Sequence, residues 1–168
     1  MKKILSILVT ITLIGTSTTS LVACNTLQKY SPEKLKELKE KKKIDTKNQE
    51  IRDNLEWIAP QEKPFNIVDN KWYYVVWRSN KNDKWRISKY KNNIELDYNN
   101  DVNIDGVLFL IKLTKSPNDL VIKKNKYYVA QWLLDKNNYF KSVYCWNLII
   151  QEPDLIIDKD GNVKVNGE

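Results

Sequence analysis

The spacing of apolar residues changes near residue 65 and divides the chain into a helical part and a β part. Residues 33–58 are rich in Lys, Glu and Leu, with sparse apolar positions, and Pro60 ends this pattern. After residue 65, β-branched and aromatic residues become dense and are separated by turn-forming residues. We therefore expect a mainly β (α+β) fold, in which an N-terminal helix or stalk precedes an antiparallel β-sheet domain built from hairpins.

Three hairpins are predicted where two apolar segments flank a short polar turn. The paired segments are 72–78 with 84–90, 127–134 with 139–150, and 155–157 with 163–165. Two further strands are predicted, one at 94–98 from alternating apolar and acidic residues, and one at 107–114 from a nearly continuous apolar run. Residues 70–85 match residues 125–140 at six of sixteen positions, so two hairpins are either duplicated or convergent.

The helical part is expected to contain two segments with different surroundings. Ser31-Pro32-Glu33 is typical of a helix start. Residues 24–45 are expected to form a lipid anchor and a solvated helical stalk. A second helix, 46–58, is predicted to dock through Ile51, Leu55 and Ile58 on a β-rich globular domain that spans 46–168. Coiled-coil assembly is the alternative, but the missing apolar d positions argue against it.

The first 24 residues match a bacterial export signal. A positive start precedes an apolar stretch, Ile4–Gly15, that is too short to span a bilayer. Leu21-Val22-Ala23-Cys24 then matches a lipobox, which predicts a signal peptide at 1–23 and a diacylglyceryl group on Cys24. The alternative is an uncleaved anchor at 4–23, although eight Ser or Thr residues there make a poor membrane helix. The predicted partner is thus the lipid bilayer, bound through acylated Cys24.

Composition argues against several classes of function. The 168 residues include no histidine, which is the usual general base and the commonest metal ligand. The four glycines form no nucleotide-binding or nucleophile-elbow motif, so no cofactor is expected. Loss of Lys2 and Lys3 with the leader lowers the net charge from +7 to +5. This small positive charge argues against nucleic-acid binding. Cys145, the remaining thiol, is expected to be buried and structural.

One segment resembles half of a calcium-binding loop. Asp101, Asn103 and Asp105 place oxygen ligands at alternate positions before Gly106. The twelfth position, where a bidentate glutamate is needed, is Lys112. We therefore expect a turn between two strands here rather than a metal site.

Two pairs of acids are the candidates for carboxylate-dependent hydrolysis. Glu95 and Asp97 lie on one predicted strand, and Glu152 and Asp154 flank Pro153. A glycosidase needs two facing acids in one cleft, and solvated strand faces also explain both pairs. The chain is therefore predicted not to be an enzyme, with a hydrolase as the less favoured alternative.

Aromatic residues interleaved with lysines are the feature that points to binding. The candidate contact residues are Trp72, Trp77, Arg78, Trp85 and Trp132. Most of the aromatic residues are expected in a core that uses Trp and Tyr in place of Leu and Val. A small exposed cluster of rings beside cations would suit contact with a host or environmental macromolecule. We predict a non-enzymatic binding or adhesion-type module, with a structural or assembly lipoprotein without ligand as the alternative.

The leader, the segment Lys71–Arg78 with Asn82–Trp85, and the ending Ile157–Val163 together resemble small lipoproteins of spiroplasma-type mollicutes. The resemblance implies a membrane lipoprotein on a wall-less cell, facing the extracellular side. It implies no catalytic residues and no specific activity.

Overall fold

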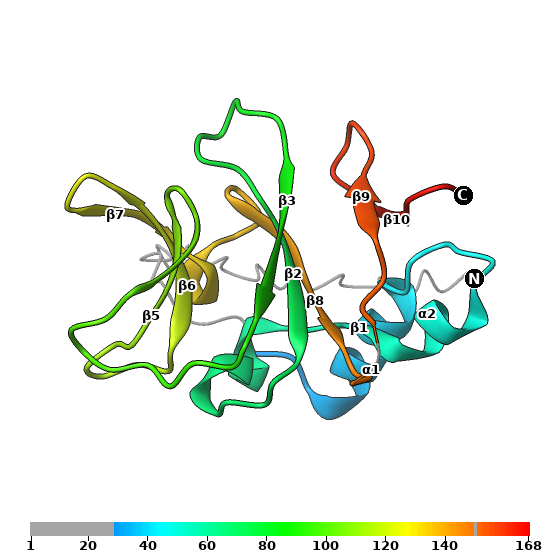
Figure 1. Cartoon of the computed structure of the whole chain (residues 1–168), viewed down its shortest axis with the longest axis horizontal. Helices are drawn as coiled ribbons and strands as arrows, with labels where there is room; N and C mark the ends of the chain where they lie inside the picture. Colours follow the sequence, from blue (N-terminus) through cyan, green and yellow to red (C-terminus); the bar gives the residue numbers. More distant parts are fainter. Residues whose placement is uncertain (1–28, 150) are drawn as a thin grey trace, which may run out of the picture.

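A computed structural model describes residues 29–149 and 151–168 and shows a mainly β fold, as predicted (Figure 1). Its helices are α1 (Pro32–Lys41), α2 (Gln49–Asn54), η1 (Pro60–Glu62), η2 (Pro64–Asn66) and η3 (Trp132–Leu134). Its strands are β1 (Leu55–Trp57), β2 (Trp72–Trp77), β3 (Arg86–Lys91), β4 (Val102–Asp105), β5 (Leu108–Ile111), β6 (Asp119–Lys124), β7 (Tyr127–Gln131), β8 (Phe140–Trp146), β9 (Leu155–Ile157) and β10 (Val163–Val165). They form antiparallel sheets ordered β1-β8-β2-β3, β4-β5-β6-β7 and β10-β9.

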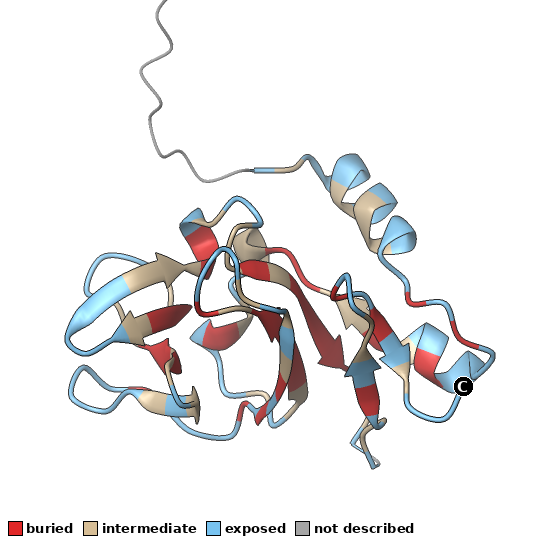
Figure 2. Ribbon diagram, turned by 90° about the horizontal axis from the view of Figure 1, so that it is seen from above, coloured by how far each residue is buried: buried red, intermediate tan, exposed pale blue. Residues whose placement is uncertain are grey.

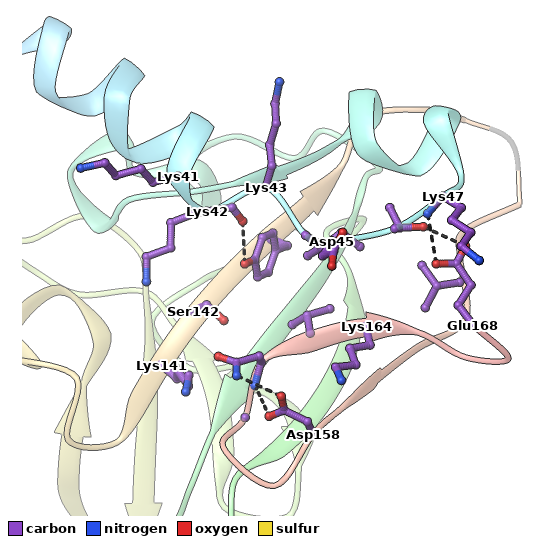
Figure 3. Close-up of a pocket in the computed structure, with 17 residues that line it drawn as sticks. Lys41, Lys42, Lys43, Asp45, Lys47, Lys141, Ser142, Asp158, Lys164 and Glu168 are labelled. Carbon is purple, nitrogen blue, oxygen red and sulfur yellow. Dashed lines mark hydrogen bonds between the residues drawn. The ribbon is translucent and has the colours of Figure 1, made fainter.

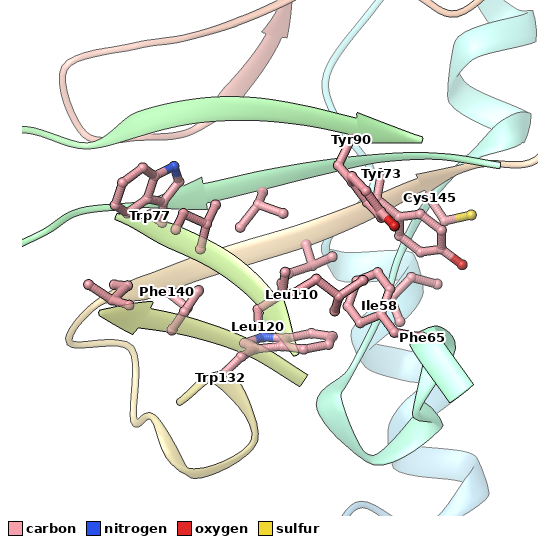
Figure 4. Close-up of a cluster of buried hydrophobic side chains, with 14 of the residues drawn as sticks. Ile58, Phe65, Tyr73, Trp77, Tyr90, Leu110, Leu120, Trp132, Phe140 and Cys145 are labelled. Carbon is pink, nitrogen blue, oxygen red and sulfur yellow. The ribbon is translucent and has the colours of Figure 1, made fainter. Parts of the chain in front are cut away.

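The main core lies between the two four-stranded sheets. Alternate residues of β2, namely Tyr73, Val75 and Trp77, pack with inward residues of β5 and β6 such as Leu110 and Leu120 (Figure 4). Successive side chains of a strand point to opposite faces, so this core uses only half of β2. Each fully buried aliphatic side chain contributes about 1.5–3 kcal/mol through its removal from water.

The second core covers the opposite face of the same central sheet. Tyr74 and Val76 of β2 pack there against Ile44 and Ile51, and the hairpin β9–β10 adds Val163. Figure 2 shows the buried residues gathered in the central strands between these layers. The large side chains on both faces of β2 are therefore covered from both sides.

The predicted helix at 46–58 is wrong in its second half. Helix α2 ends at Asn54, and Leu55–Trp57 forms β1, which pairs with β8. The sequence pattern allowed both outcomes because Ile51, Leu55 and Ile58 are buried in either case. Pairing with β8 satisfies the backbone groups that a longer helix would otherwise have satisfied internally.

The predicted hairpin between 127–134 and 139–150 is also wrong. Strand β7 pairs with β6, whereas β8 pairs with β1 and β2 in the other sheet. The turn at Asn125, with φ of 56°, closes β6 onto β7 before β8 begins. The chain crosses between the sheets at η3, where apolar Trp132 and Leu133 enter the core.

The predicted strand at 94–98 is likewise absent from the described residues, although Leu96 is buried. The Asp97 carboxylate accepts hydrogen bonds from the backbone N–H groups of Asn99 and Asn100 at 2.7 and 2.9 Å. This side-chain bonding supports a turn in place of a strand ladder. The remaining predicted hairpins, β2–β3 and β9–β10, are confirmed.

The matching segments 70–85 and 125–140 share a local conformation but not a common topology. Asn70 and Asn125 both adopt left-handed φ values, 58° and 56°, and each precedes a strand by two residues. However, β2 and β3 are sheet neighbours, while β7 and β8 belong to different sheets. The similarity therefore extends over a turn and a strand, not over two equivalent hairpins.

Helix α1 is attached to the domain mainly through polar contacts. It buries none of its residues, and the Lys39 ammonium lies 2.5 Å from a carboxylate oxygen of both Glu56 and Glu62. Tyr30 and Gln61 also exchange hydrogen bonds near its start. No helix among the described residues is long and apolar enough to cross a membrane. The predicted signal peptide and Cys24 lie outside the described residues.

Candidate functional site

Two tryptophans of the predicted binding set, Trp77 and Trp132, are core residues, and so is Trp146, which lies outside that set. Trp77 and Trp146 are almost fully buried, and Trp132 is 6% exposed. The Trp77 indole N–H donates a 2.8 Å hydrogen bond to Ser88 Oγ, so this N–H group already has an acceptor within the protein. Trp77 and Trp132 are therefore unable to contact a ligand in this fold, and their assignment as contact residues is wrong.

The remaining candidates lie at the surface beside cations. Trp72 and Trp85 are half-buried; Lys89 Nζ lies 4.8 Å from the centroid of the Trp72 ring. The Arg78 guanidinium lies 4.3 Å from the Trp85 ring centroid. Such contacts stabilise each pair by about 0.5–1 kcal/mol at an exposed site, and they also cover a ring face.

Two neighbouring tyrosines outside the set of candidate contact residues are more exposed than any member of that set. Tyr127 and Tyr128 on edge strand β7 are 77% and 60% exposed. Lys123 Nζ lies 5.7 Å from the Tyr128 ring and 5.0 Å from the Phe109 ring. We call this group of four residues the tyrosine surface.

The segment that resembles a calcium loop forms strand β4 and, at Gly106, the start of the turn that leads to β5. Asp101 pairs with Lys123, Asp105 accepts a 2.7 Å hydrogen bond from Ser88, and the Asn103 side chain donates to the Gly106 carbonyl. Within the described residues, no three His, Cys, Asp or Glu side chains are placed to hold a metal ion.

The two acidic pairs are held by separate neighbours. Asp97 forms the turn described above, and Glu152 Oε1 lies 2.6 Å from Lys89 Nζ. The Asp154 carboxylate accepts a 2.7 Å hydrogen bond from the Asn166 side chain. These contacts give the acids roles in turns and ion pairs at the surface.

A buried acid that sequence reasoning missed also has a structural role. Asp119 is 2% exposed, and its two carboxylate oxygens accept hydrogen bonds from the N–H groups of Leu120 and Leu133. Burial raises the pKa of Asp119 to about 7. Burial similarly raises the pKa of the Cys145 thiol to about 11, which keeps it protonated and unreactive near neutral pH.

A pocket lies beside β8, between residues 41–47 and the β9–β10 hairpin (Figure 3). It encloses about 590 Å³, within the range typical of small-molecule sites. We call it the lysine pocket because its lining includes Lys41, Lys42, Lys43, Lys47, Lys141 and Lys164. Three acids, Asp45, Asp158 and Glu168, accompany them, leaving a net charge of +3.

Residues 42–46 are fixed over β8 by contacts at both ends of this segment and at its centre. The Tyr144 hydroxyl donates a 2.9 Å hydrogen bond to the Lys42 carbonyl, and Ile44 inserts into the second core. At the other end, the Thr46 hydroxyl donates a 2.9 Å hydrogen bond to Glu168. The pocket wall is thus anchored by specific contacts at three positions.

The positive charges of the pocket are only partly neutralised. Lys41 and Lys43 form ion pairs with Glu37 and Glu40, and Figure 3 shows both side chains directed away from the pocket. Of the six lysines that line the pocket, four form no ion pair with a carboxylate of the described residues: Lys42, Lys47, Lys141 and Lys164. The Lys141 ammonium donates to the Asp160 carbonyl, which leaves its charge uncompensated.

Ser142 adds a neutral hydrogen-bonding group to this positive site. Its side chain is 7% exposed, it lines the pocket, and it lies between the Lys42 and Lys141 side chains and the hairpin (Figure 3). Its hydroxyl makes no hydrogen bond within the described part of the chain. Among the described residues, the only buried side-chain polar atom without a partner is the Tyr90 hydroxyl, so the Ser142 oxygen is accessible from the pocket. It can therefore bind an anionic oxygen that enters the pocket.

Two of the three acids that line the pocket accept hydrogen bonds from the protein itself. Asp158 accepts hydrogen bonds from the N–H groups of Asp160 and Asn162, and the Asn162 contacts are the main cause of its lowered pKa. Glu168 is held by the Thr46 hydroxyl and by the Lys47 N–H. Asp45, the third acid of the lining, is exposed and forms no ion pair among the described residues, so an incoming anion meets the lysines and one unpaired carboxylate.

Part of the predicted binding set adjoins this pocket. Trp85 packs against Gly161, and Lys141 Nζ lies 5.8 Å from the Trp85 ring that Arg78 also covers. Arg78, Lys141 and the pocket thus form a continuous cationic strip. Comparison of the chain with protein-family models, with curated proteins and with solved structures gives no match.

Proposed function

We propose that this chain is a lipid-anchored, non-enzymatic surface module that binds an anionic macromolecule in the lysine pocket. The observation that supports it most is that four lysines without a carboxylate partner line one pocket, two of which, Lys42 and Lys141, lie beside the Ser142 hydroxyl (Figure 3). Ammonium and hydroxyl groups together bind oxyanions by charge-assisted hydrogen bonds. The proposed contact residues are therefore the lysines of the lysine pocket, whereas the sequence predicted mainly tryptophans.

Acylated Cys24 would hold this pocket close to a membrane. Seven residues separate Cys24 from the start of α1, and a fully extended segment of that length spans about 25 Å. The domain would therefore face the extracellular side at the membrane surface, in keeping with the resemblance to mollicute lipoproteins. A positive pocket there favours capture of acidic polymers from the surroundings.

Binding is favoured over catalysis by the surroundings of Ser142. A serine nucleophile needs a base within hydrogen-bond distance. The Asp158 and Glu168 carboxylates instead bond to Asn162 and to Thr46. The Ser142 hydroxyl thus lies among cations that suit ground-state binding of an anion.

Self-association is the second candidate function, and the tyrosine surface favours it. Tyr127 and Tyr128 are exposed on β7, an edge strand whose free backbone groups can pair with another strand. Sedimentation of the full-length protein in detergent, with Tyr127→Ser/Tyr128→Ser as the comparison, distinguishes this function. A monomer that still binds an acidic polymer would favour the lysine pocket.

The proposed function is tested by the affinity of the full-length protein, in non-ionic detergent micelles, for dextran sulfate. Lys42→Gln/Lys141→Gln should weaken binding roughly tenfold, because each lysine contributes on the order of 0.7 kcal/mol. Lys81→Gln/Lys126→Gln is the matched control: it removes the same charge from exposed positions outside the pocket. Thermal unfolding verifies that both variants fold. An equal loss in both variants, or no binding by the unaltered protein, would contradict the proposal.

A further inference from the structure

One end of the lysine pocket already holds an anion, the carboxylate of Glu168. Its Oε1 accepts a 2.9 Å hydrogen bond from the Thr46 hydroxyl, and its Oε2 accepts a 3.3 Å hydrogen bond from the Lys47 N–H. Thr46 is 4% exposed, so its hydroxyl is a buried donor that requires an acceptor. A hydroxyl, a backbone N–H and a nearby ammonium group form a donor set suited to an oxyanion.

The other end of the pocket has a similar donor set without a carboxylate. There the Lys42 and Lys141 ammonium groups flank the Ser142 hydroxyl, as Figure 3 shows. Glu168 and this group lie at opposite ends of the same pocket. The pocket therefore contains two anion positions, one of which the protein fills with its own side chain.

The cations outside the pocket indicate that its ligand is a polymer. Beyond Lys141 the strip continues to Arg78, and both side chains lie near the Trp85 ring at 5.8 and 4.3 Å. A small anion bound inside the pocket would not contact cations that lie outside the pocket opening. A chain with repeated negative groups can contact them all, and the combined contacts strengthen binding.

The aromatic surroundings favour an acidic polysaccharide over a nucleic acid. Single-stranded nucleic acids are bound by stacking of bases on exposed aromatic rings. In the pocket, the Tyr144 ring is buried and its hydroxyl is bonded to Lys42, while Arg78 and Gly161 cover the Trp85 ring. The site thus offers donors for oxyanions but no free ring face for a base.

We infer that the lysine pocket binds an acidic polysaccharide at two positions, and that one anionic group of the polymer displaces the Glu168 carboxylate from Thr46 and Lys47. This inference rests on the proposed function and adds the ligand class and a built-in competitor. Glu168 then lowers the affinity for the polymer, because its carboxylate must leave before the second anionic group binds.

The test compares Glu168→Gln and Glu168→Ala with Asp45→Asn in full-length protein, with dextran sulfate as the probe. Asp45 is the matched control, since it is an exposed acid that lines the same pocket. Both Glu168 variants should bind the polymer about fivefold more tightly than the unaltered protein, and Asp45→Asn less than twofold. Adding Thr46→Val to Glu168→Gln should abolish the gain, whereas Thr46→Ser, which keeps the hydroxyl, should retain it.

The outcomes separate this inference from the proposed function. If the unaltered protein binds the polymer through Lys42 and Lys141 but the Glu168 variants match Asp45→Asn, only the second anion position is overturned. An equal affinity and equal gain with a 20-residue oligothymidylate would overturn the assignment to a polysaccharide. If the polymer does not bind at all, the proposed function fails as well.

Discussion

The Tyr144 hydroxyl donates a 2.9 Å hydrogen bond to the backbone carbonyl of Lys42, a residue 102 positions earlier in the chain. This contact fixes the segment that carries Lys42 over strand β8, from which Lys141 and Ser142 also come. Together with the burial of Ile44 and the bond from Thr46 to Glu168, this hydroxyl positions the cations of the two segments relative to each other. Burial raises the pKa of Tyr144 to about 12, so the hydroxyl remains a donor at physiological pH.

Tyr144→Phe should weaken polymer binding without removing any charge. Loss of the hydrogen bond should lower the free energy of unfolding by about 1 kcal/mol and release the segment that carries Lys42. Tyr73→Phe is the control, because the Tyr73 hydroxyl donates a 2.7 Å hydrogen bond to Asp69 on the other side of the sheet. Urea denaturation and dextran sulfate titration measure the two effects. Equal affinities of the two variants would contradict a positioning role for Tyr144.

Gly161→Ala should destabilise the domain more than Gly106→Ala. Both glycines have positive φ values, 78° and 58°, so each substitution costs on the order of 1 kcal/mol of backbone strain. A Cβ atom at Gly161 would lie 2.7 Å from Cγ of Trp85, whereas at Gly106 nothing lies within 4 Å. The clash should add about 1–3 kcal/mol at Gly161. Urea unfolding of both variants measures the difference, and similar losses would show that Trp85 does not pack as described.

Asp119 should make stability depend on pH between about 4 and 7. Its pKa is raised by burial from 3.8 to about 7, so the folded protein holds a proton that the unfolded chain has lost in this range. Its contribution to stability therefore falls as the pH rises through the window, by at most about 1.4 kcal/mol per pH unit. The unaltered protein should lose stability relative to Asp119→Asn from pH 4 to 7. A difference that is constant with pH would contradict the raised pKa.

Cys24→Ala should abolish membrane anchoring. The lipobox predicts that the thiol of Cys24 carries a diacylglyceryl group, and stable anchoring needs more than one acyl chain. Detergent-phase partitioning of cells that express each form, with mass spectrometry of the N-terminus, measures the effect. If the variant still partitions with membranes and keeps residues 1–23, the uncleaved-anchor alternative is correct.

Local sequence patterns predicted the β class and several strands because those patterns reflect local burial. Strands β2, β3, β9 and β10 lie where apolar segments flank short turns. Residues 55–57 were misassigned because the burial of Leu55 fits both a docked helix and a strand beside β8. That choice depends on a pairing partner about 90 residues away, which periodicity does not reveal.

The candidate site was predicted in part, for the same reason. Arg78 and Trp85 lie beside the pocket, but Trp77 and Trp132 face the core between the sheets. The pocket itself combines residues 41–47, β8 and the β9–β10 hairpin. No local motif joins these segments; the only sequence signal was the run of lysines at 41–43, which a solvated helix explains equally well.

The central claim, that the lysine pocket is the binding site, is tested most directly by hydrogen–deuterium exchange of the full-length protein with and without dextran sulfate. Each peptide reports whether its own backbone amides become protected when the polymer binds. We predict added protection in peptides that cover 41–47, 141–146 and 158–165, with none in 123–131. Protection confined to 123–131, where Tyr127 and Tyr128 are exposed, would contradict the account and assign binding to the tyrosine surface.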